Sequence, residues 1–124
     1  MSDVWDKYKT ADQPIICMVG VIALCVSLSK IDGDFSDDEL LEILKLVPHK
    51  EEESDYILNL INEIDEGNLD FTFHAQNLKK YLGDQKNFLE FIIATLYKLA
   101  LTDHVIDEKE LEMIKKTKKI FEES

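Results

Sequence analysis

The stretch IICMVGVIALCVSL, residues 15–28, is the longest apolar run in the sequence. It is shorter than the roughly 18 to 20 apolar residues that a helix needs to cross a bilayer, so we expect no direct membrane insertion. A second, nearly continuous apolar stretch, FLEFIIATLYKLAL, occupies residues 88–101. Both have the composition of helices that are buried on nearly all sides. We therefore expect two buried central helices that pack against each other in the core.

The segments around these two stretches have the periodicity of helices. Their apolar residues recur at spacings of three and four, and we find no convincing alternation of period two. The chain also contains only two prolines and four glycines. The sequence thus predicts an all-α fold, a compact bundle of about six or seven helices. A short amphipathic segment is expected around Val4, Trp5 and Tyr8. The other expected helices span approximately residues 12–30, 36–47, 50–65, 70–82, 85–102 and 107–121.

The length of 124 residues is that of one domain, and we expect a single helical domain over residues 1–124. Within it, residues 1–12 are expected to form a short N-terminal helix or arm. Cys17 and Cys25 lie eight positions apart on one expected helix. That spacing separates them by about 12 Å, too far for a disulfide, so both are expected to be buried, reduced thiols. The polar, acidic N-terminus does not resemble a signal peptide, which favours a cytoplasmic protein.

The charge of the chain is strongly negative. Asp and Glu number 26 against 14 basic residues, which gives a net charge of −12, and every basic residue is Lys. Without arginine, and with this excess of acid, nucleic acid is not an expected partner. An acidic surface attracts cations or a basic protein surface and is repelled by an anionic membrane leaflet. Solubility alone is the alternative explanation of the charge.

A short acidic motif occurs twice. KIDGDFSDDELLEIL at residues 30–44 is followed, at a constant offset of 71 positions and without a gap, by LTDHVIDEKELEMIK at residues 101–115. Each copy joins a buried helix to an amphipathic one, so the two halves of the bundle should be pseudo-symmetric. The equivalent pairs are Asp32 and Asp103, Phe35 and Ile106, Ser36 and Asp107, Glu39 and Glu110, and Leu40 and Leu111.

The glutamates of the repeat have two interpretations. Glu39 and Glu110 each follow a helix-capping residue by three positions, so both fit a capping box. Gly33 likewise fits a turn that needs a positive φ. Alternatively, if the two buried helices pack antiparallel about a pseudo-twofold axis, the two turns could meet near that axis. Four carboxylates would then share one small volume and would raise one another's pKa or recruit a cation.

The residues of such a site favour a hard cation. Asp32, Glu39, Asp103 and Glu110, with Asp34 beside them, would form an oxygen-rich shell of the kind that suits Ca²⁺ or Mg²⁺. His104 would add a nitrogen that Mn²⁺ or Zn²⁺ accepts, which makes these two ions the less expected ones. An EF-hand is excluded, because a twelve-residue loop has no glutamate at its last position here, whether it starts at Asp32 or at Asp34.

The two copies together resemble the TerB-like domain. Each is a buried helix that ends in an acidic turn, followed by an apolar residue and a Glu, and the resemblance covers residues 14–122. This domain is shared by tellurite-resistance TerB proteins and the N-terminal region of DjlA co-chaperones. The resemblance implies an all-helical, pseudo-symmetric domain whose acidic turns bind metal, with links to tellurite and chemical stress and to membrane-associated complexes. The positions that match are Asp32, Gly33, Glu39, Asp103 and Glu110, whereas His104 departs from the usual glycine.

The remaining candidate residues do not favour catalysis, and two of them are candidates for contact with a protein partner. His49 and His74 have no neighbouring ligand at metal spacing, which favours surface or capping roles. Trp5 and Tyr8 either cover the bundle or dock on a protein partner. No phosphate loop, zinc-protease helix or serine elbow is present in the sequence, so we do not expect an enzyme.

The sequence therefore predicts a non-enzymatic, TerB-like module that binds a divalent cation through its repeated turns in a tellurite or chemical stress response. A protein partner is expected, in a membrane-associated complex or as a homodimer. The alternative is an adaptor or co-chaperone-like interaction module in which the acidic turns are only helix caps.

Overall fold

The computed structural model describes residues 3–31, 35–101 and 107–123. In these ranges the chain forms seven α-helices, one short 3-10 helix and no strand, which confirms the all-α prediction. The predicted helix boundaries agree with the structure to within a few residues. The elements are α1 (Val4–Tyr8), α2 (Gln13–Ser29), α3 (Asp37–Leu46), η1 (Glu51–Glu53), α4 (Ser54–Gly67), α5 (Phe71–Leu82), α6 (Lys86–Leu101) and α7 (Glu108–Glu122).

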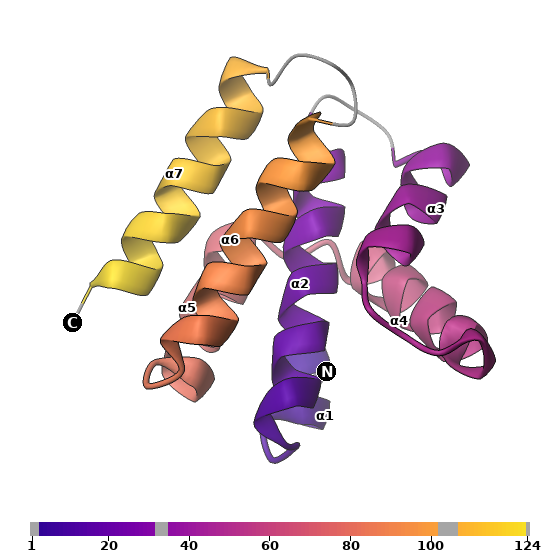
Figure 1. The fold of residues 1–124 in the computed structure, drawn as a ribbon, viewed down its shortest axis with the longest axis horizontal. Coiled ribbons are helices and arrows are strands. Elements are labelled where there is room, and N and C mark those ends of the chain that lie inside the picture. Colours follow the sequence, from indigo (N-terminus) through magenta and orange to yellow (C-terminus); the bar gives the residue numbers. More distant parts are fainter. Residues whose placement is uncertain (1–2, 32–34, 102–106, 124) are drawn as a thin grey trace.

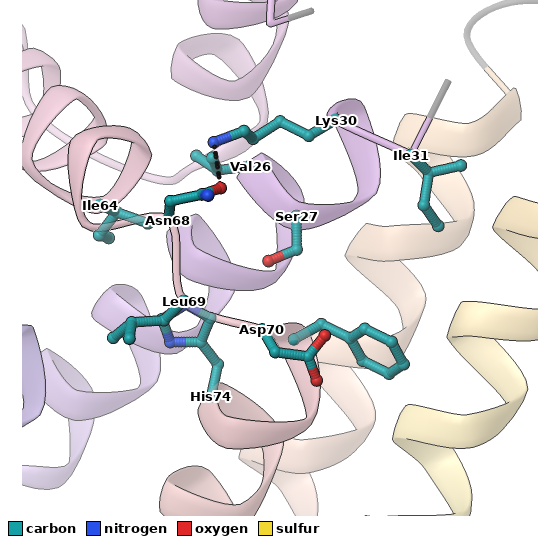
Figure 2. Close-up of a pocket in the computed structure, with 10 residues that line it drawn as sticks. Val26, Ser27, Lys30, Ile31, Ile64, Asn68, Leu69, Asp70 and His74 are labelled. Carbon is teal, nitrogen blue, oxygen red and sulfur yellow. Dashed lines mark hydrogen bonds between the residues drawn. The ribbon is translucent and has the colours of Figure 1, made fainter. Parts of the chain in front are cut away.

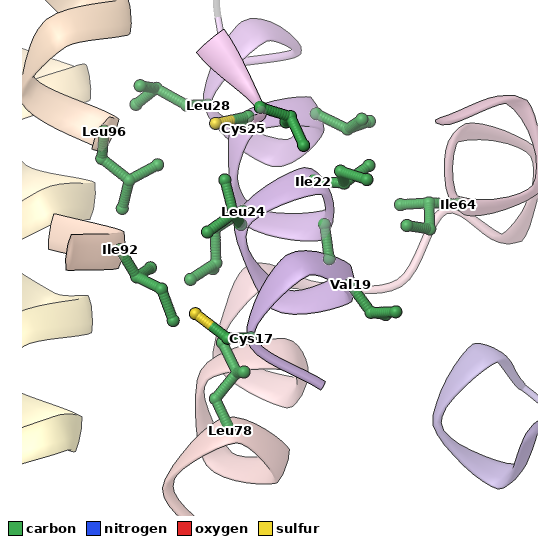
Figure 3. Close-up of a cluster of buried hydrophobic side chains, with 14 of the residues drawn as sticks. Cys17, Val19, Ile22, Leu24, Cys25, Leu28, Ile64, Leu78, Ile92 and Leu96 are labelled. Atoms are coloured by element: carbon green, nitrogen blue, oxygen red, sulfur yellow. The ribbon is translucent and has the colours of Figure 1, made fainter. Parts of the chain in front are cut away.

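Helix α2 is the central element of the bundle (Figure 1). It contacts α1, α3, α4, α5 and α6, and its side chains are buried on every side from Ile16 onward, apart from a few partly covered positions. Figure 3 shows these side chains spreading outward from α2 toward α4, α5 and α6. Cys17 and Cys25 are free and buried, as predicted, and burial raises the pKa of their thiols to about 11 and about 12.

Helix α6 packs along α2, but it is covered on one face only. Its inward face includes Ile92 and Leu96, which are fully buried. Phe91 and Leu101 are 39% and 56% exposed on the outward face. The prediction of two buried central helices is therefore right for α2 and only half right for α6. The error arose because the outward positions of α6 are themselves apolar and give no signal of exposure.

The two apolar helices run in the same direction, which differs from the antiparallel arrangement considered from the sequence. Figure 1 shows both of them rising from the lower to the upper end of the view. The three helices between them explain this, because α3, α4 and α5 return the chain to the end at which α2 starts. Helix α6 then repeats the course of α2, and α7 packs beside it on α5 and α6.

Helix α1 is part of the bundle and not a separable arm. It contacts α2 and α4, and Trp5 on it is only 2% exposed. The Trp5 indole N–H donates to His74 Nδ1 over 2.9 Å, and the indole ring stacks on Tyr81. The first helix is thus anchored to the core by a side chain whose partners lie on α5.

Candidate functional site

The described parts of the two copies of the acidic motif lie at the same end of the molecule. Each copy connects one of the parallel helices, α2 or α6, to the amphipathic helix that follows it, α3 or α7. Figure 1 shows α2 and α6 ending, and α3 and α7 beginning, at the upper end of the view. The parallel course of α2 and α6 therefore brings the two halves of the repeat to one end of the bundle.

The first copy contains a complete capping box at the start of α3. The backbone N–H of Glu39 donates to Ser36 Oγ over 3.2 Å, and Glu39 Oε1 accepts from the backbone N–H of Ser36 over 3.1 Å. The Ser36 hydroxyl also donates to the same carboxylate oxygen over 3.0 Å. These bonds satisfy backbone donors that the first turn of a helix leaves without partners. The capping role predicted for Glu39 is thus confirmed.

The second copy repeats this arrangement at the start of α7. Asp107 Oδ1 accepts from the backbone N–H of Lys109 over 2.7 Å. Glu110 Oε1 accepts from the backbone N–H of Asp107 over 3.3 Å, so this copy is also a capping box. The capping prediction for Glu110 is confirmed as well. The sequence repeat is therefore also a repeat of local hydrogen bonding.

The remaining predicted site residues lie outside the described part of the chain: Asp32, Gly33, Asp34, Asp103 and His104. Within the described ranges, no group of three or more His, Cys, Asp or Glu side chains could hold a metal ion. The predicted ligand set therefore stays a prediction.

The carboxylates of Glu39 and Glu110, which the structure describes, are ligands of the kind that a hard cation prefers. Within the described residues, the Glu39 carboxylate accepts hydrogen bonds through Oε1, and capping does not occupy Oε2. A glutamate can cap a helix with one oxygen and coordinate Ca²⁺ or Mg²⁺ with the other, since both ions take carboxylate oxygens as ligands. Capping and cation binding are thus compatible at this residue.

The two aromatic residues predicted to contact a partner have different environments. Trp5 lies in the core, so it covers the bundle, and an exposed docking role does not fit its burial. Tyr8 is partly buried, and its hydroxyl pairs with that of Tyr56 over 2.5 Å. Burial and this hydrogen bond raise the pKa of Tyr8.

The structure also corrects the role of one histidine. His74 is 1% exposed and accepts the Trp5 hydrogen bond, so it is a core residue and not a surface or capping one. His49 fits the capping prediction better, because its Nδ1 lies 2.6 Å from the carbonyl oxygen of Val47 at the end of α3. A signal for His74 was present in the sequence, since His74 lies three and four positions from Phe71 and Leu78 on the apolar face of its helix.

These features define a class of protein: an all-helical domain built on a repeated pair of helices, with acidic capped turns at one end. The family model described as tellurite resistance protein TerB matches residues 18–123, and the chain belongs to this family. No match was found among curated proteins or among solved structures. Within the described residues, no helix is both long and apolar enough to span a membrane.

Proposed function

We propose that this TerB-family domain binds a divalent cation, preferably Ca²⁺ or Mg²⁺, through the carboxylates of its two repeated turns. One observation carries the proposal: the two capping boxes lie at the same end of the bundle, each next to an acidic turn. The residues that would hold the ion are Asp32, Glu39, Asp103 and Glu110, with Asp34 or His104 as further ligands. A bound cation would supply the positive charge that relieves repulsion among these carboxylates.

The proposed role is one of binding and not catalysis. The domain would act in the cytoplasm in a response to tellurite or other chemical stress, with a protein partner in a membrane-associated complex. Family membership supports this setting, because the matching family is described by tellurite resistance. The cation would then link the two halves of the domain and make its stability depend on the metal.

Thermal unfolding of chelator-treated protein tests the cation site. Ca²⁺, Mg²⁺, Mn²⁺ and Zn²⁺ are titrated in turn, and the midpoint of unfolding is recorded. An ion that binds only the folded state stabilises it by about 2.7 kcal/mol at a hundred times its dissociation constant. We expect a saturable rise with Ca²⁺ or Mg²⁺, and the absence of a rise with all four ions would reject the site.

The double variant Asp32→Asn with Asp103→Asn should abolish this rise. The matched control is Asp38→Asn with Glu108→Gln, which removes the same charge from exposed positions in the first turns of α3 and α7. The control should keep the full metal dependence. If both variants lose the rise in the unfolding midpoint, the stabilisation by cations depends only on the overall negative charge and not on a specific site.

Glutamine substitutions separate capping from coordination. A capping box accepts Gln in place of Glu, so Glu39→Gln with Glu110→Gln should leave the metal-free stability nearly unchanged. Loss of a charged ligand should nevertheless weaken cation binding by tenfold or more, measured as the shift in the titration midpoint. Unchanged binding would assign both glutamates to capping alone.

A protein-interaction module is the second candidate function. Both glutamates already act as caps, and α6 exposes Phe91 and Leu101, so an exposed apolar face is available. Binding to a partner that persists in chelator and is lost in Phe91→Ser would favour this candidate. Trp5 is unsuitable for the test, because its removal would disrupt the core.

A further inference from the structure

A cavity of about 520 Å³ lies where the end of α5, the first half of α6 and the last turns of α7 come together. Figure 1 shows these three segments toward the lower left of the view, away from the starts of α3 and α7. The volume is in the range of sites that bind small molecules. We call it the α5–α7 cavity, and it is separate from the repeated turns.

The most deeply buried residues that line the α5–α7 cavity are apolar. Leu89 and Phe121 are 7% and 6% exposed, and Ile93 is partly buried and packs against the core. Gly83 lines the cavity as well. A Cβ added to Gly83 would lie 2.7 Å from the carbonyl oxygen of Lys79, so the chain needs a residue without a side chain here. The cavity therefore offers an apolar surface to the carbon skeleton of a ligand.

Lys79 brings a partly buried positive charge to the same cavity. Its Nζ donates to the carbonyl oxygen of Phe121 over 2.7 Å, which satisfies one of the carbonyls that the end of α7 leaves without a partner. An ammonium group has three donors, and within the described residues no carboxylate forms an ion pair with this one. A partly buried cation without a counter-ion favours a ligand that is negatively charged.

Two further lysines line the α5–α7 cavity, Lys86 on α6 and Lys118 on α7. Both are exposed, and in the part of the chain that the structure describes neither forms an ion pair. The cavity beside α2 in Figure 2 differs in this respect. Its lysine, Lys30, is held by Asp65 Oδ1 at 2.8 Å and by Asn68 Oδ1 at 3.0 Å. Lysine ammonium groups are thus available to a ligand in the α5–α7 cavity, whereas Lys30 is already paired.

The charges in and around the cavity favour a ligand with a single negative charge. Glu90 and Glu122 also line it, so its three lysines and two glutamates leave one net positive charge. The surrounding segments, residues 79–101 and 113–123, contain eight lysines and four acidic residues, whereas the rest of the chain contains six lysines and 22 acidic residues. The rest of the molecule therefore repels a polyanion far more strongly than a small monoanion.

We propose that the α5–α7 cavity binds a small amphipathic carboxylate, a molecule with one carboxylate group and an apolar chain, as a medium-chain fatty acid has. The carboxylate is attracted by the lysine ammonium groups, which act as point charges. The apolar chain packs against the apolar part of the lining, Leu89, Ile93 and Phe121. This site does not depend on the cation proposal or on a protein partner.

The test is an NMR titration of the complete, ¹⁵N-labelled protein at pH 7 and constant ionic strength. Octanoate has the carboxylate and the chain, octan-1-ol has the chain without the charge, octylammonium has the opposite charge, and acetate lacks the chain. We expect octanoate to shift the backbone N–H signals of Gly83 and Phe121 saturably. Octan-1-ol should bind several fold more weakly, and the other two probes should give no saturable shift of these signals. Equal binding of octan-1-ol and octanoate, or saturable binding of acetate or octylammonium, would overturn the proposed ligand class.

Two matched double variants locate the binding. Lys86→Gln with Lys118→Gln removes two exposed positive charges from the cavity and should weaken octanoate binding by about tenfold, the combined value of two exposed ion pairs. Lys9→Gln with Lys109→Gln removes the same charge from exposed lysines that do not line the cavity, and should leave binding unchanged. The unfolding midpoint of each variant is measured beside its titration. Equal octanoate affinity in the two variants, or no saturable shift in the wild type, would show that the cavity is not a carboxylate site.

Discussion

At the scale of single residues, His74 is a titratable group that lies in the core, 1% exposed. Burial lowers its pKa from 6.5 to about 4, and the carboxylates of Asp3 and Asp70 oppose this shift only in part. The imidazole is therefore neutral at physiological pH, which its role as acceptor for Trp5 requires. A buried neutral histidine makes the folded state sensitive to acid, because at acid pH the histidine binds a proton in the unfolded chain and stays neutral in the folded chain.

This difference predicts how stability depends on pH. Because the pKa of His74 is lower in the folded state than in the unfolded chain, His74 contributes fully to the free energy of unfolding above pH 6.5. This contribution is lost as the pH falls from 6.5 toward 4. We expect the free energy of unfolding, measured with urea, to fall between pH 7 and pH 4.5 by about 2 to 3 kcal/mol more in the wild type than in His74→Asn. The carboxylates titrate in both proteins and cancel in the comparison. Equal losses would show that His74 ionises normally in the folded state.

At the scale of the elements, the contact between α2 and α5 depends on a glycine. A Cβ added to Gly20 would lie 2.2 Å from Leu78 Cδ2 and 2.8 Å from Leu78 Cγ. Leu78 is fully buried, so it has no free space into which to move. The absence of a side chain at position 20 is therefore what allows the two helices to approach this closely.

Gly20→Ala should destabilise the protein despite the better helix propensity of Ala. Propensity favours Ala by about 1 kcal/mol, but overpacking costs about 1 to 3 kcal/mol, and this severe clash lies at the upper end. We expect a net loss of about 1 to 2 kcal/mol in chemical unfolding. Gly67→Ala is the matched control, since a Cβ there meets nothing within 4 Å. A gain in stability for Gly20→Ala would contradict the close contact, and adding Leu78→Ala should recover part of the loss.

At the scale of the whole molecule, local sequence patterns predicted the helices but not how they are arranged. Periodicity located the seven α-helices of the described residues, and the repeat located Glu39 and Glu110 as caps, because both signals are contained in a few neighbouring residues. The parallel course of α2 and α6 depends on tertiary packing, which has no local signal. The exposure of Phe91 and the pairing of Trp5 with His74 were missed for the same reason. The proposed ligands in the turns lie outside the described residues.

The negative charge is unevenly distributed along the chain. Residues 1–78 contain 17 acidic residues and five lysines, whereas residues 79–124 contain nine of each, so the whole net charge of −12 falls in the first part. The ion pairs Lys7–Glu63, Lys45–Glu42 and Lys116–Glu112 are largely solvent-exposed, and such pairs contribute little to stability. Repulsion among acidic groups should therefore outweigh attraction.

Salt should consequently stabilise the protein. Raising the ionic strength from about 0.01 M to about 0.1 M shortens the Debye length from about 30 Å to about 10 Å, which screens this repulsion. We expect the midpoint of thermal unfolding in chelator to rise by a few degrees. NaCl and choline chloride should have equal effects if screening is the cause. A fall in the midpoint would show that the ion pairs dominate.

The pairing of Trp5 with His74 also has a consequence for the order in which the chain is completed. The two residues are 69 positions apart. At about 5 to 20 residues per second, a ribosome adds that length in roughly 3 to 14 seconds. Until α5 has been synthesised, the indole of Trp5 lacks both its hydrogen-bond acceptor and the Tyr81 ring on which it stacks. Helix α1 therefore cannot reach its final place until α5 has also been made.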